Sequence, residues 1–284
     1  MRADCHIHML LDGQYWKAAI DGHRSGPDLP LIRERLRAYA EAGFTYLRDG
    51  GDRWGVGAAA RELAGEYGIT YRTPLANLCC KGHYGGFIGA YYDNLREYAA
   101  LVRKIREDGG DFIKIMISGI MDFDCCGKLS EEGLEPAVIR ELIHIAHEEG
   151  FSVMAHANGA RTVEAAALAG VDSVEHGAYL DEDALRAMAE HDVIWCPTLS
   201  AVANLLGKGR FREEAVKGIC EITSENLRRF AAMGGTIAPG SDAGAWAVPH
   251  CGGSLDEYRH LEAVLGEKTG DILDRGTARV MAKF

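Results

Sequence analysis

The chain has 284 residues, of which 47% are hydrophobic, and this length suits one α/β barrel with a filled interior. Its 31 basic and 42 acidic residues give a formal net charge of −11, and no segment is rich in lysine and arginine. Because nucleic acids and anionic membranes are bound by basic surfaces, we expect neither as a partner. The acidity would suit a cationic substrate, although net negative charge commonly serves only to keep a protein in solution.

The sequence carries no signal for export or membrane insertion. Met1 is followed almost at once by the CHIH segment at 5–8, without the apolar stretch of a signal peptide, and no apolar run reaches the length of a membrane span. The eight cysteines include two adjacent pairs, at 79–80 and 125–126, which suit neither a disulfide framework nor a CxxC zinc site. We therefore expect a cytoplasmic protein that acts on a small molecule, as a monomer or a homo-oligomer.

Short β-rich runs alternate with amphipathic helical runs in the first half of the chain, which is typical of βα units around a parallel sheet. Four strands are predicted there, over residues 3–9, 44–48, 69–78 and 111–118. Helices are predicted over residues 31–42 and 56–67, in a run that ends at 107, and in another that begins near 135–136. A long loop rich in glycine and aromatic residues, 82–92, follows the third strand.

The second half continues the alternation. Strands are predicted over residues 151–157, 171–176, 193–197 and 236–241. Helices are predicted over 160–169, from 181–183 onward, in a longer region through 233, and from the last strand to the C-terminus. Eight strands in alternation with about eight helices predict one α/β domain over residues 1–284, a (β/α)8 TIM barrel. A doubly wound open sheet is the alternative, but it usually has a glycine-rich phosphate turn after its first strand, and residues 5–10 contain no glycine.

In such a barrel the chemistry lies at the carboxyl ends of the strands. The polar residues at the predicted strand ends form an unusual set. They are His6, His8, Lys114, His156, His176 and Asp242. Histidine and carboxylate are ligands that zinc prefers. His6 and His8 are two residues apart on a strand, so their side chains point to the same face and can share an ion. Taken alone, this pair could equally be two surface histidines.

Lys114 lies in an almost wholly apolar strand, 111–117. Burial lowers the pKa of a lysine, so a neutral amine is expected there, and such an amine can take up CO2 to form a carbamate that bridges two metals. A structural lysine that reaches the barrel rim and a Schiff-base lysine are the alternatives. The Schiff-base reading leaves the four strand-end histidines unexplained.

His156 and His176 each stand where a hydrophobic strand gives way to a loop. Two such histidines on neighbouring strands, beside the lysine strand, favour metal ligation over core packing. Asp242 follows the last strand and is either a helix N-cap or a general base that acts on a metal-bound water. His144 and His147 are three residues apart on a helix and are better interpreted as packed or solvated residues of the outer ring.

The order HxH, Lys, His, His, Asp resembles the amidohydrolase superfamily, in the subtype with a carbamylated lysine and two zinc ions. The resemblance covers residues 3 to about 262. The segments DFIKIMISG (111–119), SVEHGAY (173–179), CPTL (196–199) and IAPGSDAG (237–244), with the loop at 82–85, resemble the prolidase-like and Xaa-Arg/Lys dipeptidase branch.

The resemblance implies a role for each strand-end residue. His6, His8 and Asp242 would hold one metal, His156 and His176 the other, and Lys114 as a carbamate would bridge both. A hydroxide shared by the metals would attack the carbonyl of an amide or peptide bond in a dipeptide or N-acyl amino acid, and Asp242 would pass the proton to the leaving amine. In that branch a loop histidine and a tyrosine after strand six contact the substrate, and here these match His83 and Tyr179.

The chain departs from the branch in two respects. Most members carry a small β-sandwich formed from both chain ends, and this sequence has no length for one outside the barrel. The loop after strand three reads KGHYG at 81–85, so dipeptide specificity does not carry over directly.

Three other functions are considered. A lactonase or phosphotriesterase would use the same centre. A deaminase of the adenosine type would have a glutamate three residues after the strand-five histidine, where this chain has Gly159. A catalytically silent barrel that serves as a binding module is disfavoured by the full set of six ligand positions.

Overall fold

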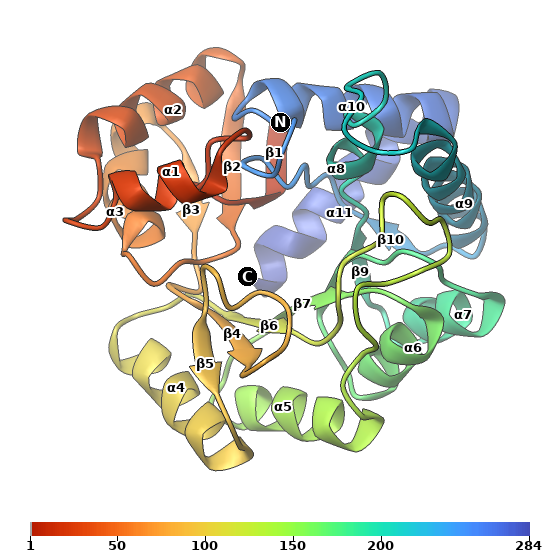
Figure 1. Ribbon diagram of the computed structural model, residues 1–284, viewed down its shortest axis with the longest axis horizontal. Coiled ribbons are helices and arrows are strands. Elements are labelled where there is room, and N and C mark those ends of the chain that lie inside the picture. The colour runs from red at the N-terminus through yellow and green to blue at the C-terminus, as the bar shows by residue number, and fades with distance from the viewer. Residues whose placement is uncertain (1) are drawn as a thin grey trace.

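The computed structural model describes residues 2–284, in which parallel strands alternate with helices. The strands lie around a central axis and the helices form the outer layer (Figure 1). The strands are β1 (Arg2–Ile7), β2 (Phe44–Asp49), β3 (Thr70–Arg72), β4 (Asn77–Cys80), β5 (Ala90–Tyr92), β6 (Ile113–Met116), β7 (Val153–Ala157), β8 (Ser173–His176), β9 (Ile194–Cys196) and β10 (Thr236–Ile237). The α-helices are α1 (Trp16–Gly22), α2 (Leu29–Glu41), α3 (Val56–Ala64), α4 (Leu95–Glu107), α5 (Pro136–Glu148), α6 (Ala160–Leu168), α7 (Glu182–Glu190), α8 (Ser200–Ala203), α9 (Glu213–Ala232), α10 (Gly252–Leu265) and α11 (Thr269–Lys283).

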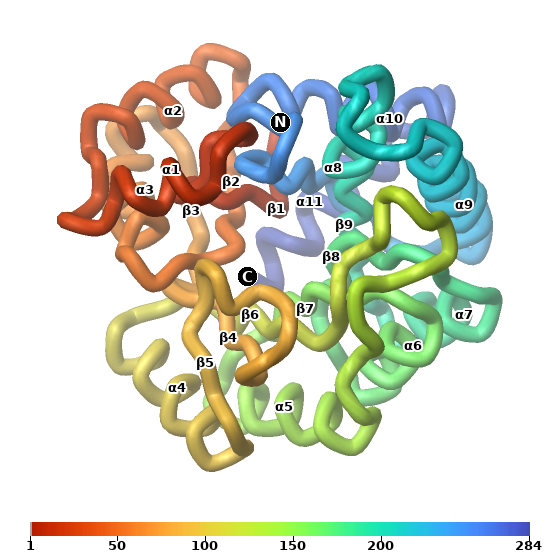
Figure 2. Tube along the Cα trace, viewed as in Figure 1, coloured from red at the N-terminus to blue at the C-terminus, as the bar shows by residue number. Residues whose placement is uncertain are grey.

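The strands form two parallel sheets, in the orders β1-β2-β3 and β10-β9-β8-β7-β6-β4-β5. Backbone hydrogen bonds cross both gaps between the sheets. Cys5 N donates to Pro239 O (2.8 Å) beyond β10, and Asp111 N donates to Thr73 O (3.0 Å). In Figure 2 the chain passes once around the axis, so the first strand lies beside the segment after β10. Since neighbouring strands are parallel, the loops after them gather on one side of the molecule.

The predicted strand at 69–78 is wrong as a single strand, because it is divided into β3, which pairs with β2, and β4, which pairs with β6. Pro74 has no N–H to donate to a ladder, and Leu75 has a positive φ of 63°, which a strand does not accommodate. The predicted 82–92 loop also ends in β5, which pairs with β4. The strand predicted at 236–241 is short: it ends at Ile237, and beyond Ala238 the backbone of Pro239 and Asp242 bonds to β1. Helix α1 was not predicted.

The space enclosed by the strands is filled by side chains and contains a buried ion pair. Arg48 on β2 and Glu175 on β8 are both fully buried, and Arg48 Nη2 donates to Glu175 Oε1 (2.9 Å). Arg48 Nε also donates to Cys5 O (2.7 Å), and its guanidinium lies 4.4 Å from the centre of the Phe284 ring. The pair links strands of the two sheets across the axis, and apolar residues of β1, β2 and α11 close the space around it.

The described residues form no separate β-sandwich, because β1 to β10 all belong to the two sheets. None of the helices found in residues 2–284 has both the length and the apolar character needed to cross a bilayer.

Candidate metal centre

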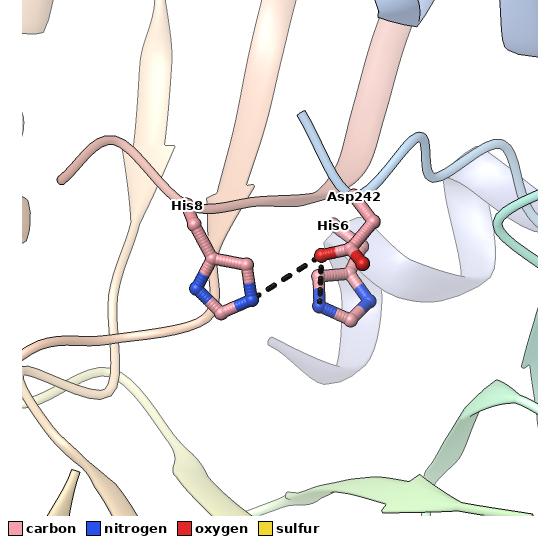
Figure 3. A group of neighbouring side chains, drawn as sticks. All are labelled: His6, His8 and Asp242. Carbon is pink, nitrogen blue, oxygen red and sulfur yellow. Dashed lines mark ion pairs between the residues drawn. The ribbon is translucent and has the colours of Figure 1, made fainter. Parts of the chain in front are cut away.

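Two histidines at the end of β1 meet an aspartate that follows β10 (Figure 3). Asp242 Oδ1 lies 3.3 Å from His8 Nε2 and 3.6 Å from His6 Nε2. One donor atom from each of the three residues lies within 4.8 Å of the others, a spacing that suits a shared cation. The three side chains therefore fit a metal ion.

Two buried carboxylates hold the backbone on either side of this group. Asp4 on β1 accepts a hydrogen bond from Ser241 N (2.9 Å), directly before the aspartate of the cluster. Asp49 at the end of β2 accepts one from Met9 N (3.0 Å), directly after the second histidine. Burial raises the pKa of both carboxyls to about 6. Their hydrogen bonds anchor the cluster to the strands rather than to free loops.

A glycine makes room for one of the imidazoles. Gly50 follows β2, and a Cβ atom built there would lie 2.3 Å from Cε1 of His8. Any other residue at position 50 would displace the ring, so this glycine is required by close approach.

The remaining strand-end residues complete the floor of the site. The His176 ring at the end of β8 lies 5.2 Å from the His6 ring and 4.6 Å from the His156 ring of β7. Lys114 on β6 is fully buried, and its Nζ has no hydrogen-bond partner among the described residues. All six predicted ligand residues line one cavity. The structure therefore brings together six side chains that are up to 236 positions apart in the sequence, from His6 to Asp242.

Burial shifts these groups toward the unprotonated forms that metal ligands need. Loss of hydration lowers the pKa of Lys114 to about 8. Burial, reinforced by neighbouring cationic groups, holds the pKa values of His6, His156 and His176 well below that of a free imidazole. The three histidines are therefore neutral at pH 7, with a lone pair free to bind a cation.

Outer groups orient the imidazoles. Glu175 Oε2 lies 2.8 Å from His6 Nδ1, although without the alignment of a hydrogen bond. His176 Nδ1 lies 2.7 Å from Thr198 Oγ1. In the His176 ring this hydrogen bond occupies Nδ1 and leaves Nε2 for another partner, the arrangement typical of metal-binding histidines. In the His6 ring the carboxylate lies beside Nδ1.

The structure gives His83 and Tyr179, the two residues predicted to contact substrate, other neighbours. The His83 side chain is 41% exposed and its Nδ1 lies 3.4 Å from Glu131 Oε2. Tyr179 packs against the apolar cluster that contains Met121 and Ala178. Neither lines the cavity, whereas Tyr84, the neighbour of His83, does.

The cavity above the six residues has a volume of about 710 Å³ and is rich in aromatic side chains. One series of ring contacts leads from its rim to its floor: Trp16 to Phe87 (5.2 Å), Phe87 to Tyr84 (6.2 Å), and Tyr84 to His156 (4.9 Å). A second group joins Phe123 to Phe211 (5.1 Å) and Phe211 to Trp246 (6.0 Å). The lining above the floor is therefore largely aromatic.

Sequence reasoning missed the supporting residues Asp4, Arg48, Asp49 and Glu175. The signal that identified Lys114, a charged residue within an apolar strand, also applies to Arg48 and Glu175. Tyr84 had no such signal, because aromatic residues are common in that loop.

Comparison with known proteins shows which proteins this chain is similar to in sequence and in fold. No family model matches the chain. Ochratoxinase of Aspergillus niger is 26% identical over 277 residues, which cover 84% of this chain and 56% of that protein, so the chain spans about half the length of the curated relatives it matches. Among solved structures, a Xaa-Pro dipeptidase with bound methionine (22% identical) and an amidohydrolase (22%) each superpose with a TM-score of 0.78 over 99% of this chain and 74% of theirs. The chain shares the fold of these two structures.

The same fold also occurs in the crystal structure of A. niger ochratoxinase, which superposes with a TM-score of 0.78 at 19% identity, over 99% of this chain and 70% of that one. The expected superfamily is thus supported at the level of fold. The subtype with a carbamylated lysine and two zinc ions, and the dipeptidase branch, stay predictions.

Proposed function

We propose that this chain is a metal-dependent amidohydrolase that cleaves an amide or peptide bond of a small substrate at the mouth of a closed (β/α)8 barrel. The observation that carries the proposal is the set of six nitrogen and oxygen donors on one cavity floor. The names of structural neighbours, a dipeptidase and a phenylurea hydrolase, belong to enzymes that cleave carbon–nitrogen bonds. Hydrogen bonds across both gaps between the sheets support the closed barrel.

The residues present fit a pair of divalent ions, most simply zinc. His6, His8 and Asp242 would hold one ion, and His156 and His176 the other. A buried ammonium without a partner is unfavourable, and conversion of Lys114 to a carbamate would remove that charge and supply two bridging oxygens. When bound, the ions would polarise the carbonyl and make hydroxide available at neutral pH.

Asp242 is suited to move the proton. Burial alone would raise its pKa, but the hydrogen bond from His8 and the nearby cationic groups keep that pKa below its ordinary value. The carboxylate is therefore ionised at pH 7, can accept the proton of the attacking water, and can deliver it to the nitrogen of the leaving amine. An amide needs this step because an amide anion is a poor leaving group.

Metal analysis and a substrate panel test the proposal. Purified protein should contain about two divalent ions per chain and should hydrolyse N-acyl amino acids or dipeptides in preference to lactones and aryl phosphotriesters. Clearly less than one ion per chain would favour a silent barrel, and preferential cleavage of lactones or phosphotriesters would favour the alternative hydrolases.

A further inference from the structure

The cavity and the whole protein differ in the sign of their charge. The chain carries a net charge of −11, yet Asp242 is the one carboxylate among the described residues that line the cavity. Two exposed cations, Lys17 after β1 and Arg210 between α8 and α9, line the same cavity. The electrostatic potential at the cavity entrance is therefore positive, because the lining there contains two cations and no acidic residue beside them.

Arg210 is held in a definite orientation. Its guanidinium carbon lies 4.5 Å from the centre of the Trp246 ring and 5.2 Å from that of Phe211. Stacking on aromatic rings fixes the plane of a guanidinium while its N–H edge stays free to donate. No carboxylate in residues 2–284 forms an ion pair with it, although many other arginines are paired, as Arg186 is with Glu182. An arginine so placed has its donors available to a ligand.

A lysine in the same loop carries the same charge as Arg210 but lies outside the cavity lining. Lys208 is exposed two residues before Arg210, but it does not line the cavity. Lys208 and Arg210 each add one positive charge to the loop, but only the charge of Arg210 lies at the cavity.

We propose that Arg210 is an anion subsite that binds a carboxylate on the substrate, while the surrounding rings accept an apolar group. The planar N–H edge of arginine matches the two oxygens of a carboxylate. The identity of the anion as part of an amide substrate rests on the proposed function. The preferred substrates are then N-acyl amino acids with an apolar or aromatic acyl group and a free carboxylate.

The same subsite argues against substrates with a cationic side chain. A lysine or arginine side chain of a dipeptide would find Asp242 as its one carboxylate partner in the described lining, and two cations at the entrance would repel it. The resemblance to Xaa-Arg/Lys dipeptidases therefore does not extend to their substrate preference.

The test measures binding, so that it does not depend on hydrolysis. N-benzenesulfonyl-L-leucine and N-benzenesulfonyl-L-leucinol differ in one group, a carboxylate against an alcohol, and the sulfonamide resists amidohydrolysis. Dissociation constants are measured by calorimetry on the protein as purified, for the wild type, Arg210→Met, Arg210→Lys and the control Lys208→Met. We expect the wild type and Lys208→Met to bind the carboxylate about tenfold more tightly than the alcohol.

Arg210→Met should lower this preference to less than about twofold, and Arg210→Lys should keep part of it, because lysine retains the charge without the planar edge. A preference that survives in Arg210→Met would overturn the proposal and assign the carboxylate to the metals or to Lys17. Failure of both ligands to bind the wild type would overturn it as well. Preference for the carboxylate without any amide cleavage would leave the subsite in place and contradict the hydrolase function instead.

Discussion

The floor and the rim of the cavity are built in different ways. The floor consists of strand ends, and its histidines and aspartate are braced by buried groups such as Asp4, Asp49 and Glu175. The rim consists of loops and short helices, and its contacts are ring stacking and the exposed cation Arg210. A scaffold that places donor atoms within a few tenths of an ångström suits bond cleavage, whereas loops can change without disturbing it. We therefore expect chemistry to depend on the floor and substrate choice on the rim.

Asp242→Asn gives the largest expected effect, because an amide can occupy the position of the carboxylate but cannot accept the proton. We expect kcat/KM for the best amide substrate to fall by about 10²- to 10⁴-fold, with little change in thermal stability. Activity within threefold of the wild type would assign the proton to another group. The matched rim variant is Arg210→Met, which should raise KM for carboxylate substrates and leave kcat nearly unchanged.

Glu175→Gln should lower both the stability of the protein and the affinity of the floor for metal. The change leaves the buried Arg48 charge unpaired, and we expect the free energy of unfolding to fall by roughly 3 kcal/mol in urea titrations. It should also weaken metal binding by about 10-fold or more, because His6 loses its orienting carboxylate.

The control is Glu182→Gln, which breaks an exposed ion pair with Arg186. Here we expect a change within about 0.5 kcal/mol. Equal effects of the two variants would show that the buried pair is not part of the support of the floor.

Glu257→Gln tests how the loop that carries Arg210 is attached to the rest of the protein. Glu257 on α10 is buried and accepts hydrogen bonds from the backbone N–H groups of Leu199 (3.0 Å) and Ser200 (2.6 Å), just before the loop that carries Arg210. Burial raises its pKa to about 8, from about 4.5 in an exposed glutamate. Folded protein therefore holds this proton between pH 4.5 and 8, whereas unfolded protein releases it.

It follows that this residue lowers the stability of the wild type as the pH rises through that window. The free energy of unfolding of the wild type, relative to Glu257→Gln, should fall by roughly 3 kcal/mol between pH 5 and pH 8. A difference that is constant or that rises with pH would contradict the raised pKa.

The smallest expected effect compares two neighbours in the loop after β4. Tyr84→Leu removes a ring that packs on His156 and lines the cavity, and we expect KM for aromatic substrates to rise by about 5- to 10-fold. His83→Ala should change KM by less than about twofold, since its side chain does not line the cavity. The reverse order of effects would restore the prediction that His83 contacts the substrate.

The alternation of strands and helices, and the six candidate ligands, could be predicted from the sequence alone. Parallel strands bring their carboxyl ends together, so residues such as His6, Lys114 and Asp242 are expected to meet once each is assigned to a strand end. The division of the third strand at Pro74 and Leu75 also has a local signal in the sequence, because proline has no N–H to donate to a strand ladder.

Only the tertiary structure decided what surrounds those ligands. The Arg48–Glu175 pair joins two sheets across the axis, and no local pattern relates positions 127 residues apart. The position of Tyr84 in the cavity lining, and the stacking of Arg210 on Trp246, depend on the paths of irregular loops. Strand periodicity determines which way a side chain points, whereas in loops without such a period the direction is set by packing against distant residues.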